Sequence, residues 1–224
     1  MLDKNEPTLG TADRVTSANR NHLIHYNGNA VVWQTANRIQ ADTVDIDRDK
    51  KTLVADGKVT TWFEDKAKED SEQPQPARPP QPTFTIVRAP HMVYTDQDRL
   101  ASYNGGVDFR RPDLTVKSAA LKAYLNPQDS DADSRINHAL GDGQVEIVQF
   151  VSTDHRQRVG NSEHAEYYTD EGKVILTGGD PKLNDSIRGN TKGDKLTYYT
   201  DGKRLDIEGG SPEKKAQSHL RKKS

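Results

Sequence analysis

The sequence predicts an all-β protein, an elongated antiparallel sheet built from about six repeated pairs of strands. Three observations carry this prediction: a glycine-anchored repeat runs along most of the chain, apolar and polar residues alternate within each copy, and helical spacing of apolar residues is almost absent. One strand pair cannot hold itself together, whereas stacked neighbouring pairs bury a shared apolar face.

The repeat is clearest between residues 41–59 and 89–107, which align over 19 residues without a gap. In both copies an alanine is followed 16 positions later by a glycine, and residues 12–30 keep the same spacing. The six copies lie at residues 12–30, 41–59, 89–107, 118–145, 167–181 and 198–212. We therefore predict one domain over residues 12–212.

Each copy reads as a strand, a polar turn and a returning strand. Ile39 and Ala41 alternate with polar residues, and Val44 and Ile46 do so out of step with them, which indicates a β-bulge. The returning strand, such as residues 53–55, is predicted to end at the repeated glycine. A positive φ angle or a close backbone approach would explain why no side chain is used there.

Residues 118–125 contain good helix formers, yet we predict a strand. The segment lies between two prolines, and Leu121 falls where Val44 and Met92 fall in other copies.

Several segments lie outside the repeat or interrupt it. Residues 1–11 form an N-terminal extension, and residues 213–224 form a basic tail that is predicted to be disordered. A Pro-rich loop, residues 64–83, and an Asp-rich loop, residues 126–137, lengthen two of the modules.

Composition excludes several classes of protein. The chain has 224 residues, 32 Lys+Arg against 34 Asp+Glu, and 32% hydrophobic residues, so it has no basic excess for nucleic acid. No stretch approaches the roughly 18 to 20 apolar residues of a membrane-spanning helix. Because residues 1–10 lack the pattern of a signal peptide, the chain starts either as a cytosolic protein or as a mature fragment, and we favour the fragment.

The search for catalytic and metal-binding motifs is negative, so no enzyme, metal or cofactor is predicted. His22 and His25 are three residues apart, which on a strand places their rings on opposite faces. Residues 129–133 resemble the start of a calcium loop but lack its later glycine and carboxylate. Gly141 and Gly143 resemble the start of a dinucleotide fingerprint, and we interpret them as a turn. The sequence therefore favours a binding or structural protein.

Residues 28–34 followed by residues 37–47 resemble the repeat of the OstA-like family, which includes the periplasmic lipopolysaccharide-transport protein LptA. The family repeat begins with a glycine and an apolar strand and continues with an Ala-Asp pair. The later copies of this chain are similar to it in a weaker form.

The resemblance implies an open β-jellyroll, folded like a taco, whose concave apolar interior holds acyl chains. It also implies a periplasmic location and a bridge between inner and outer membranes. The expected partners are lipopolysaccharide or a related glycolipid, LptC-like and LptD-like proteins joined by edge-strand pairing, and further copies of the chain in a head-to-tail oligomer. The two lengthened loops are departures from the family pattern, and they are expected to cover or redirect the sheet edge or the mouth of the groove.

The proposed lipid-binding residues are the apolar residues of the matched strands. They are Ile39, Val44, Ile46, Leu53, Val59, Ile86, Met92, Tyr94, Leu100, Val107, Leu121, Val145 and Ile147. Phe84, Phe109 and Trp33 are weaker candidates, because aromatic residues near strand ends can also cap a sheet. A closed, dry core would show the same alternation.

Two other functions remain open at this point. The chief rival is a structural β-repeat module of an adhesin or filament, with a closed core and no lipid. The third is a carbohydrate-active enzyme on a β-solenoid, since paired carboxylates are frequent in the chain.

Overall fold

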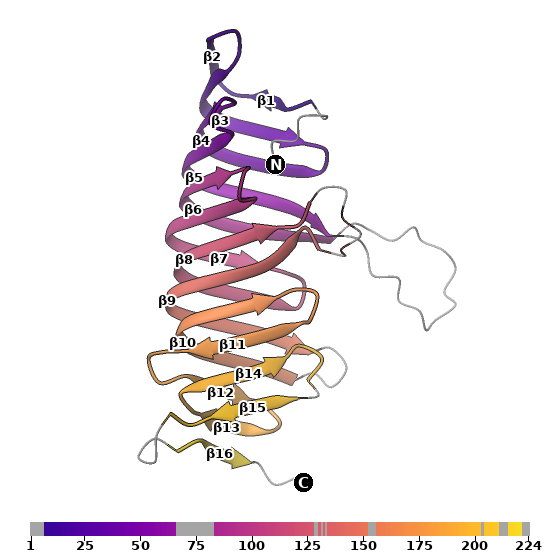
Figure 1. The fold of residues 1–224 in the computed structure, drawn as a ribbon, viewed down its shortest axis with the longest axis vertical. Coiled ribbons are helices and arrows are strands. Elements are labelled where there is room, and N and C mark those ends of the chain that lie inside the picture. The colour runs from indigo at the N-terminus through magenta and orange to yellow at the C-terminus, as the bar shows by residue number, and fades with distance from the viewer. Residues whose placement is uncertain are drawn as a thin grey trace, which may run out of the picture.

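The computed structural model describes residues 7–65, 83–127, 130, 132, 134–151, 156–202, 204–210 and 215–220. These residues form β-strands and no helix, and the strands belong to one antiparallel sheet, which confirms the predicted all-β fold (Figure 1). The strands are β1 (Leu9–Thr11), β2 (Arg14–Ala18), β3 (Leu23–Gln34), β4 (Asn37–Asp47), β5 (Thr52–Asp65), β6 (Thr83–Thr95), β7 (Leu100–Arg110), β8 (Leu114–Leu125), β9 (Ile136–Val151), β10 (Arg156–Tyr168), β11 (Lys173–Thr177), β12 (Lys182–Asp185), β13 (Gly189–Lys192), β14 (Lys195–Tyr199), β15 (Leu205–Glu208) and β16 (Gln217–Leu220).

From β3 to β11 each strand pairs with the next strand in the chain, and the sheet forks at both ends. At the N-terminal end, β2 pairs with the first half of β3 and β1 with its second half. At the C-terminal end, β12 pairs with the first half of β10 and β11 with its second half. The β11 branch continues through β14 to β15, and the β12 branch continues through β13 to β16.

The strands from β3 to β10 bend near their middle, and in β3, β5, β7 and β9 the repeated glycine lies at the bend. In β5, Gly57 and Lys58 both have positive φ angles, and the pairing of β5 with β6 shifts register between Asp56 and Val59. A Cβ atom on Gly57 would lie 2.3 Å from Oδ2 of Asp42, so both the φ angle and the close approach require glycine. The same pair of positive φ angles recurs at residues 28–29, 105–106 and 143–144.

In the first four copies the repeated glycine therefore marks a bend, where the sequence had predicted the end of a strand. In the last two copies β11 ends at Thr177 and β15 at Glu208, directly before the glycine, as predicted. β5 continues through Gly57 as far as Asp65. Gly141 and Gly143 likewise lie inside β9, so their interpretation as a turn is wrong. The predicted bulge is confirmed, because the register of β4 against β5 shifts between Gln40 and Thr43.

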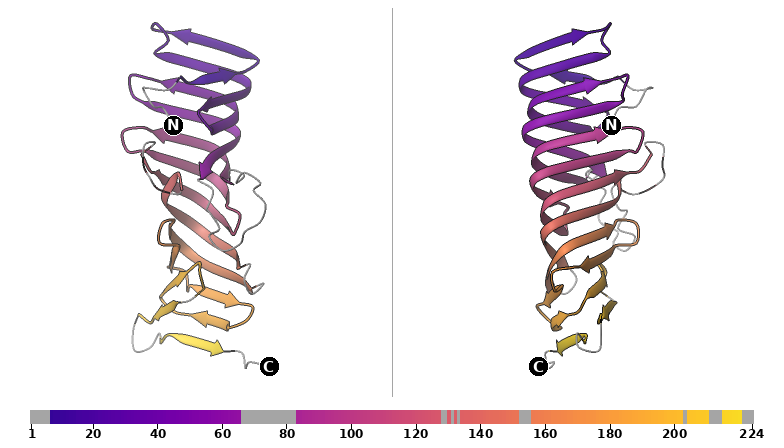
Figure 2. Two further views of the ribbon diagram at one scale, coloured as in Figure 1. Left: turned by 90° about the vertical axis from the view of Figure 1, so that its right-hand side faces the viewer. Right: turned by 60° about the vertical axis from the view of Figure 1, so that its left-hand side comes forward.

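The bends fold the sheet into two walls that face each other, with the bends on the left side of Figure 1. The first wall comprises residues 23–27, 43–47, 52–56, 91–95, 100–104, 120–125, 136–142 and 164–168, with β2, β11, β14 and β15. The second wall comprises residues 30–34, 37–41, 59–65, 83–89, 107–110, 114–118, 145–151 and 156–162, with β1, β12, β13 and β16. Figure 2 shows this long, two-walled shape from two further sides.

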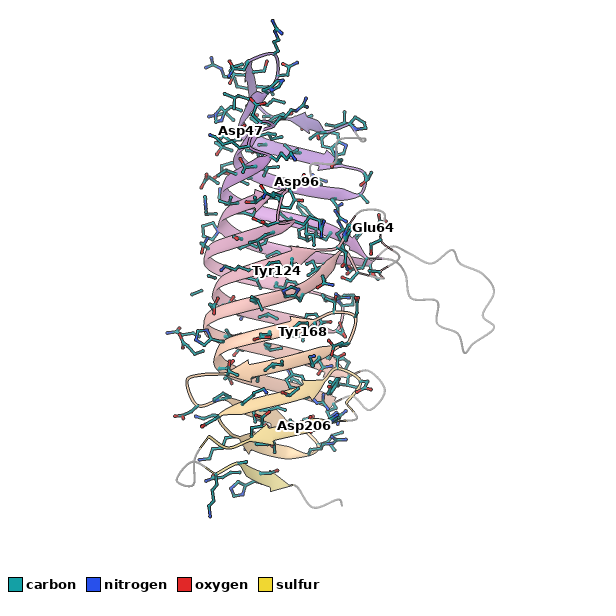
Figure 3. The ribbon with its side chains drawn as sticks, viewed as in Figure 1. Asp47, Glu64, Asp96, Tyr124, Tyr168 and Asp206 are labelled. Atoms are coloured by element: carbon teal, nitrogen blue, oxygen red, sulfur yellow. The ribbon has the colours of Figure 1, made fainter. Side chains whose placement is uncertain are left out.

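The mouth is the side opposite the bends, where the strand ends of both walls meet. In Figure 3, Asp96, Tyr124 and Tyr168 mark ends of first-wall strands, and Glu64 marks the end of a second-wall strand.

The sheet extends beyond the predicted domain of residues 12–212, because β1 precedes it and β16 follows it. Within the predicted basic tail, Gln217–Leu220 pairs with β13 and is ordered as a strand. Residues 118–125 lie in β8, so the predicted strand is confirmed. Residues 66–82 of the Pro-rich loop lie outside the described residues, and residues 136–137 of the Asp-rich loop belong to β9.

Candidate functional site

The candidate site is the interior between the two walls, which is lined by apolar side chains along the length of the sheet. Val44, Met92 and Ala123 of the first wall are fully buried, and so are Phe63 and Val87 of the second wall. These side chains belong to one continuous apolar cluster that extends from β3 to β14. The interior is therefore apolar from end to end and is filled by the protein's own side chains.

Eleven of the thirteen predicted lipid-binding residues point into this interior, and each is at most 4% exposed. They are Ile39, Val44, Ile46, Leu53, Val59, Met92, Tyr94, Val107, Leu121, Val145 and Ile147. Whether they bind lipid stays a prediction.

Ile86 and Leu100 lie on the outer face instead, and both are partly exposed. Their neighbours Val87 and Ala101 point inward and are fully buried. The repeat itself carries this signal, since Ile39 aligns with Val87 and Leu53 with Ala101 at the offset of 48 residues that relates the second and third copies. The prediction chose the more hydrophobic residue of each neighbouring pair and did not use the register of the repeat.

Other residues of the interior were missed or ranked low by the sequence. Phe109, a weaker candidate, is fully buried inside, whereas Phe84 and Trp33 are partly exposed on the outer face. Several more interior residues would have been found by taking the second residue after each repeated glycine and then every second residue along the strand. Residues of the interior that were not predicted include Ala30, Val32, Phe63, Val87, Ala101, Tyr103, Tyr167, Val174, Leu176, Leu196 and Tyr198.

One polar contact crosses the apolar interior. Oγ1 of Thr61, on the second wall, lies 2.7 Å from the hydroxyl oxygen of Tyr103, on the first wall. Burial raises the pKa of the Tyr103 phenol, so the hydroxyl stays neutral. The contact holds the two walls together in the middle of the molecule.

A cluster that we call the middle clasp joins the two walls at the mouth. Asp65, at the end of β5, accepts hydrogen bonds from Oγ1 of Thr85 at 2.7 Å, from Oγ of Ser134 at 2.8 Å and from the backbone N–H of Arg135 at 3.1 Å. The guanidinium of Arg111 donates to Ser134 and lies 3.7 Å from the Asp65 carboxylate. Ser134 and Arg135 come from the Asp-rich loop, so these two residues of the loop lie at the mouth.

A second cluster, the C-terminal clasp, closes the mouth farther along. Arg158, at 2% exposure, donates to Oδ2 of Asp185 at 3.1 Å and to the carbonyl oxygen of Tyr199 at 2.8 Å. The Gln149 side chain donates to the carbonyl oxygen of Thr200 at 2.7 Å. Burial and the neighbouring charge of Arg156 lower the pKa of the Arg158 guanidinium. Side chains of the second wall thus bind backbone carbonyls of the first wall.

Comparison with known proteins identifies this architecture. The family model described as LptA/(LptD N-terminal domain) LPS transport protein matches residues 2–75 and 86–204. The chain belongs to this family. The match includes both walls and residues of both clasps, and the family is one of transport proteins and not of enzymes.

Among solved structures, this chain is similar to the crystal structure of LptH from Pseudomonas aeruginosa, described as the LptA-homologous periplasmic component of the conserved lipopolysaccharide transport device. The TM-score is 0.52 at 14% sequence identity, over 61% of this chain and 94% of LptH. This match confirms the predicted LptA-like β-jellyroll. No curated protein matches the sequence.

The histidines of this family member make separate pairs on the outside of the sheet. Nδ1 of His22 lies 2.5 Å from Asp49, and Nδ1 of His25 lies 2.6 Å from Asp45, so the two rings have different partners. In the described residues, no group of three or more His, Cys, Asp or Glu side chains is arranged to hold a metal ion. Residues 129, 131 and 133 of the calcium-like motif lie outside the described residues.

The outer face of the first wall carries a short aromatic stack. His138 lies between Tyr124 and Tyr168, with ring centroids 4.2 Å and 5.6 Å away. Burial lowers the pKa of His138, although the charge of Glu166 opposes this.

The part of the chain that the structure describes contains no helix of the length and apolarity needed to cross a membrane.

Proposed function

We propose that this chain is a periplasmic bridge protein that binds lipopolysaccharide or a related glycolipid and passes it from the inner toward the outer membrane. The acyl chains of the bound lipid would lie between the two walls, where water cannot reach them. The observation that carries the proposal is the continuous apolar interior of the folded sheet. The hydrogen-bonded strand ladders of the described residues run around the bend, and none of them joins the two walls at the mouth. The transport family of the chain supports the proposal.

Binding requires the walls to separate, because the side chains of the interior now fill the space. Each methylene group transferred from water contributes about 0.8 kcal/mol, so several acyl chains supply enough free energy to replace the contacts between the walls. The described contacts across the mouth are side-chain hydrogen bonds of the two clasps, which are individually weaker than a strand ladder. The proposed route of entry is therefore the mouth, with the bends acting as the hinge.

Photocrosslinking tests this proposal directly. A photoreactive residue placed singly at Ile46, Met92 or Val145 is expected to form adducts with lipopolysaccharide, because all three point into the interior. The matched control is Ile86, which lies on β6 like Met92 but on the outer face. The readout is the mass shift of the protein after illumination.

A structural β-repeat module with a closed core is the second candidate function. The close packing of the interior favours it, because the eleven predicted residues are at most 4% exposed without any lipid. Folded variants that give no adduct at any of the three interior positions would establish this reading and contradict lipid transport.

We further propose that the chain joins other transport proteins, LptC-like and LptD-like, or copies of itself, through its edge strands. The forked ends leave β15 and β16 unpaired on one side at the C-terminal end, and β1 and β2 at the N-terminal end, within the described sheet. Unpaired edges add strands from a partner readily.

Ile207→Pro should impair this assembly while leaving the sheet intact. The backbone N–H of Tyr199 donates to the carbonyl oxygen of Arg204, so in the alternating pattern of an antiparallel pair the N–H of Ile207 points away from β14. Proline there removes a donor that only a partner would use. We expect that Ile207→Pro no longer forms oligomers in sedimentation experiments and is no longer captured by an LptD-like partner. The melting temperature of Ile207→Ala is the reference for its stability. Unchanged assembly at that stability would contradict edge pairing at β15.

A further inference from the structure

A hollow of about 690 Å³ lies on the outer side of the bend, across strands β5 to β8. Its floor is formed at Val59, Ala89 and Val107, whose side chains face the interior, and by the exposed ring of Pro90. The volume is in the range of sites that hold small molecules. The hollow is on the opposite face of the sheet from the candidate lipid interior.

The hollow occurs where the repeat departs from its own pattern. In the first two copies an acid faces the repeated glycine: a Cβ atom on Gly28 would lie 2.3 Å from Oδ2 of Asp13, and Gly57 has the same relation to Asp42. The third copy has Pro90 in place of the acid. Beside it, a Cβ atom on Gly106 would meet nothing within 4 Å. The departure therefore removes a negative charge and leaves open space.

Cationic side chains surround this space. Lys58, Arg88 and Lys117 line the hollow, and all three are exposed. Arg88 and Lys117 flank Asp108 in one row across the sheet, because Asp108 pairs with both in the strand register.

The carboxylates near the hollow do not neutralise this charge. Asp108 accepts two hydrogen bonds from Arg110, at 2.7 Å and 2.6 Å, so its charge is already balanced by a cation outside the rim. Glu146 lies 3.9 Å from Nζ of Lys117, and both side chains are exposed. Among the residues that line the hollow, three cations, Lys58, Arg88 and Lys117, stand against one carboxylate, Asp108, in a chain whose net charge is −2.

We propose that this hollow binds the anionic head group of an amphiphile from outside the sheet. A phosphate would lie between Arg88, Lys58 and Lys117, because guanidinium and ammonium groups are the side chains that hold phosphate best. The first methylenes of the chain would cover Pro90 and the floor beside Gly106. This site is separate from the interior and does not depend on the proposed transport function.

Titration with dodecyl phosphate below its micellar concentration tests the site. The amide signals of Gly106 and Val107 in ¹H–¹⁵N NMR spectra report on the hollow, and those of Ala101 and Ala123 report on the interior. We expect saturable shifts at Gly106 and Val107. Inorganic phosphate and dodecyl maltoside should each bind at least tenfold more weakly, since each supplies only half of the contacts.

Two variants decide the outcome. Pro90→Asp restores the acid that the first two copies carry opposite glycine, so it should fold while placing a carboxylate in the hollow. The double variant Arg88→Gln/Lys117→Gln removes two rim charges and keeps both side chains polar. Both should weaken dodecyl phosphate binding at least tenfold. Lys122→Gln, an exposed change on the first-wall half of β8, is the matched control and should bind like the parent.

Three results would overturn the proposal. The first is parental affinity in the double variant, which is informative even if Pro90→Asp fails to fold. The second is equal affinity for inorganic phosphate, which would mean an anion site without an apolar part. The third is displacement of dodecyl phosphate by an acidic peptide that binds more tightly, which would assign the hollow to a protein partner.

Discussion

Arg158→Met is expected to lower the free energy of unfolding by about 3 to 5 kcal/mol, the usual loss when one partner of a buried ion pair is removed. The variant leaves Asp185 without its hydrogen bond from Nε and leaves the carbonyl of Tyr199 without the donor at 2.8 Å. Because methionine replaces the aliphatic part of the arginine, the lost free energy comes mainly from the polar contacts. Urea unfolding followed by circular dichroism measures it.

The exposed pair of Arg204 and Asp206, with Nε and Oδ2 2.8 Å apart, provides the control. Arg204→Met should leave the unfolding midpoint unchanged, because water screens exposed pairs. If Arg158→Met is equally silent, the C-terminal clasp does not hold the mouth.

The same clasp predicts a dependence of stability on acid. Burial raises the pKa of Asp185, but the N–H groups of Arg188 and Ile187 and the guanidinium of Arg158 outweigh burial and hold that pKa below its ordinary value of 3.8. The stabilisation by Asp185 is therefore complete above pH 3.8 and is lost as the pH falls through the lower pKa of the folded state. In Arg158→Met this acid-dependent loss should be smaller.

Gly57→Ala is expected to lower the free energy of unfolding by about 3 kcal/mol. Part of the loss, about 1 to 2 kcal/mol, is the strain of an L-residue at a φ of +77°. The rest comes from the new methyl group, which would lie 2.7 Å from Cβ of Asp42 and force the neighbouring strand to move.

Gly106→Ala separates these two contributions. Gly106 also has a positive φ, +95°, but a Cβ atom there meets nothing within 4 Å. Chemical denaturation of both variants should therefore show the smaller loss for Gly106→Ala. Equal losses would mean that the close approach of neighbouring strands at the bend contributes nothing to stability.

Much of the local structure was predictable because its causes are local. Alternation assigned most strands, and the out-of-step residue between Ala41 and Val44 marked the bulge. The flanking prolines and the aligned position of Leu121 assigned residues 118–125 of β8. The repeated glycine located the bends, although the sequence was read as a strand end there. A glycine with positive φ can serve either purpose, and only the continuing ladder of β5 beyond Gly57 distinguishes them.

The candidate site was predicted less completely. Alternation identified which side of a strand is apolar, but in β6 both Ile86 and Val87 are apolar, and only the pairing with neighbouring strands sets which one faces inward. The offset between copies would have resolved this case. It could not have revealed the clasps, because Asp65 and Ser134 are 69 residues apart and belong to no repeated position.

The sequence by itself determined the family, the strand modules and the positions of the bends, since each depends on residue spacing within about 20 residues. The tertiary structure decided that the two halves of each strand from β3 to β10 face each other and that the mouth is held by Asp65 and by Arg158. It also decided that the outer bend is hollow beside Pro90. These features arise because the bends of many neighbouring strands together bring residues that are distant in the sequence into contact. No local sequence pattern specifies this combined effect.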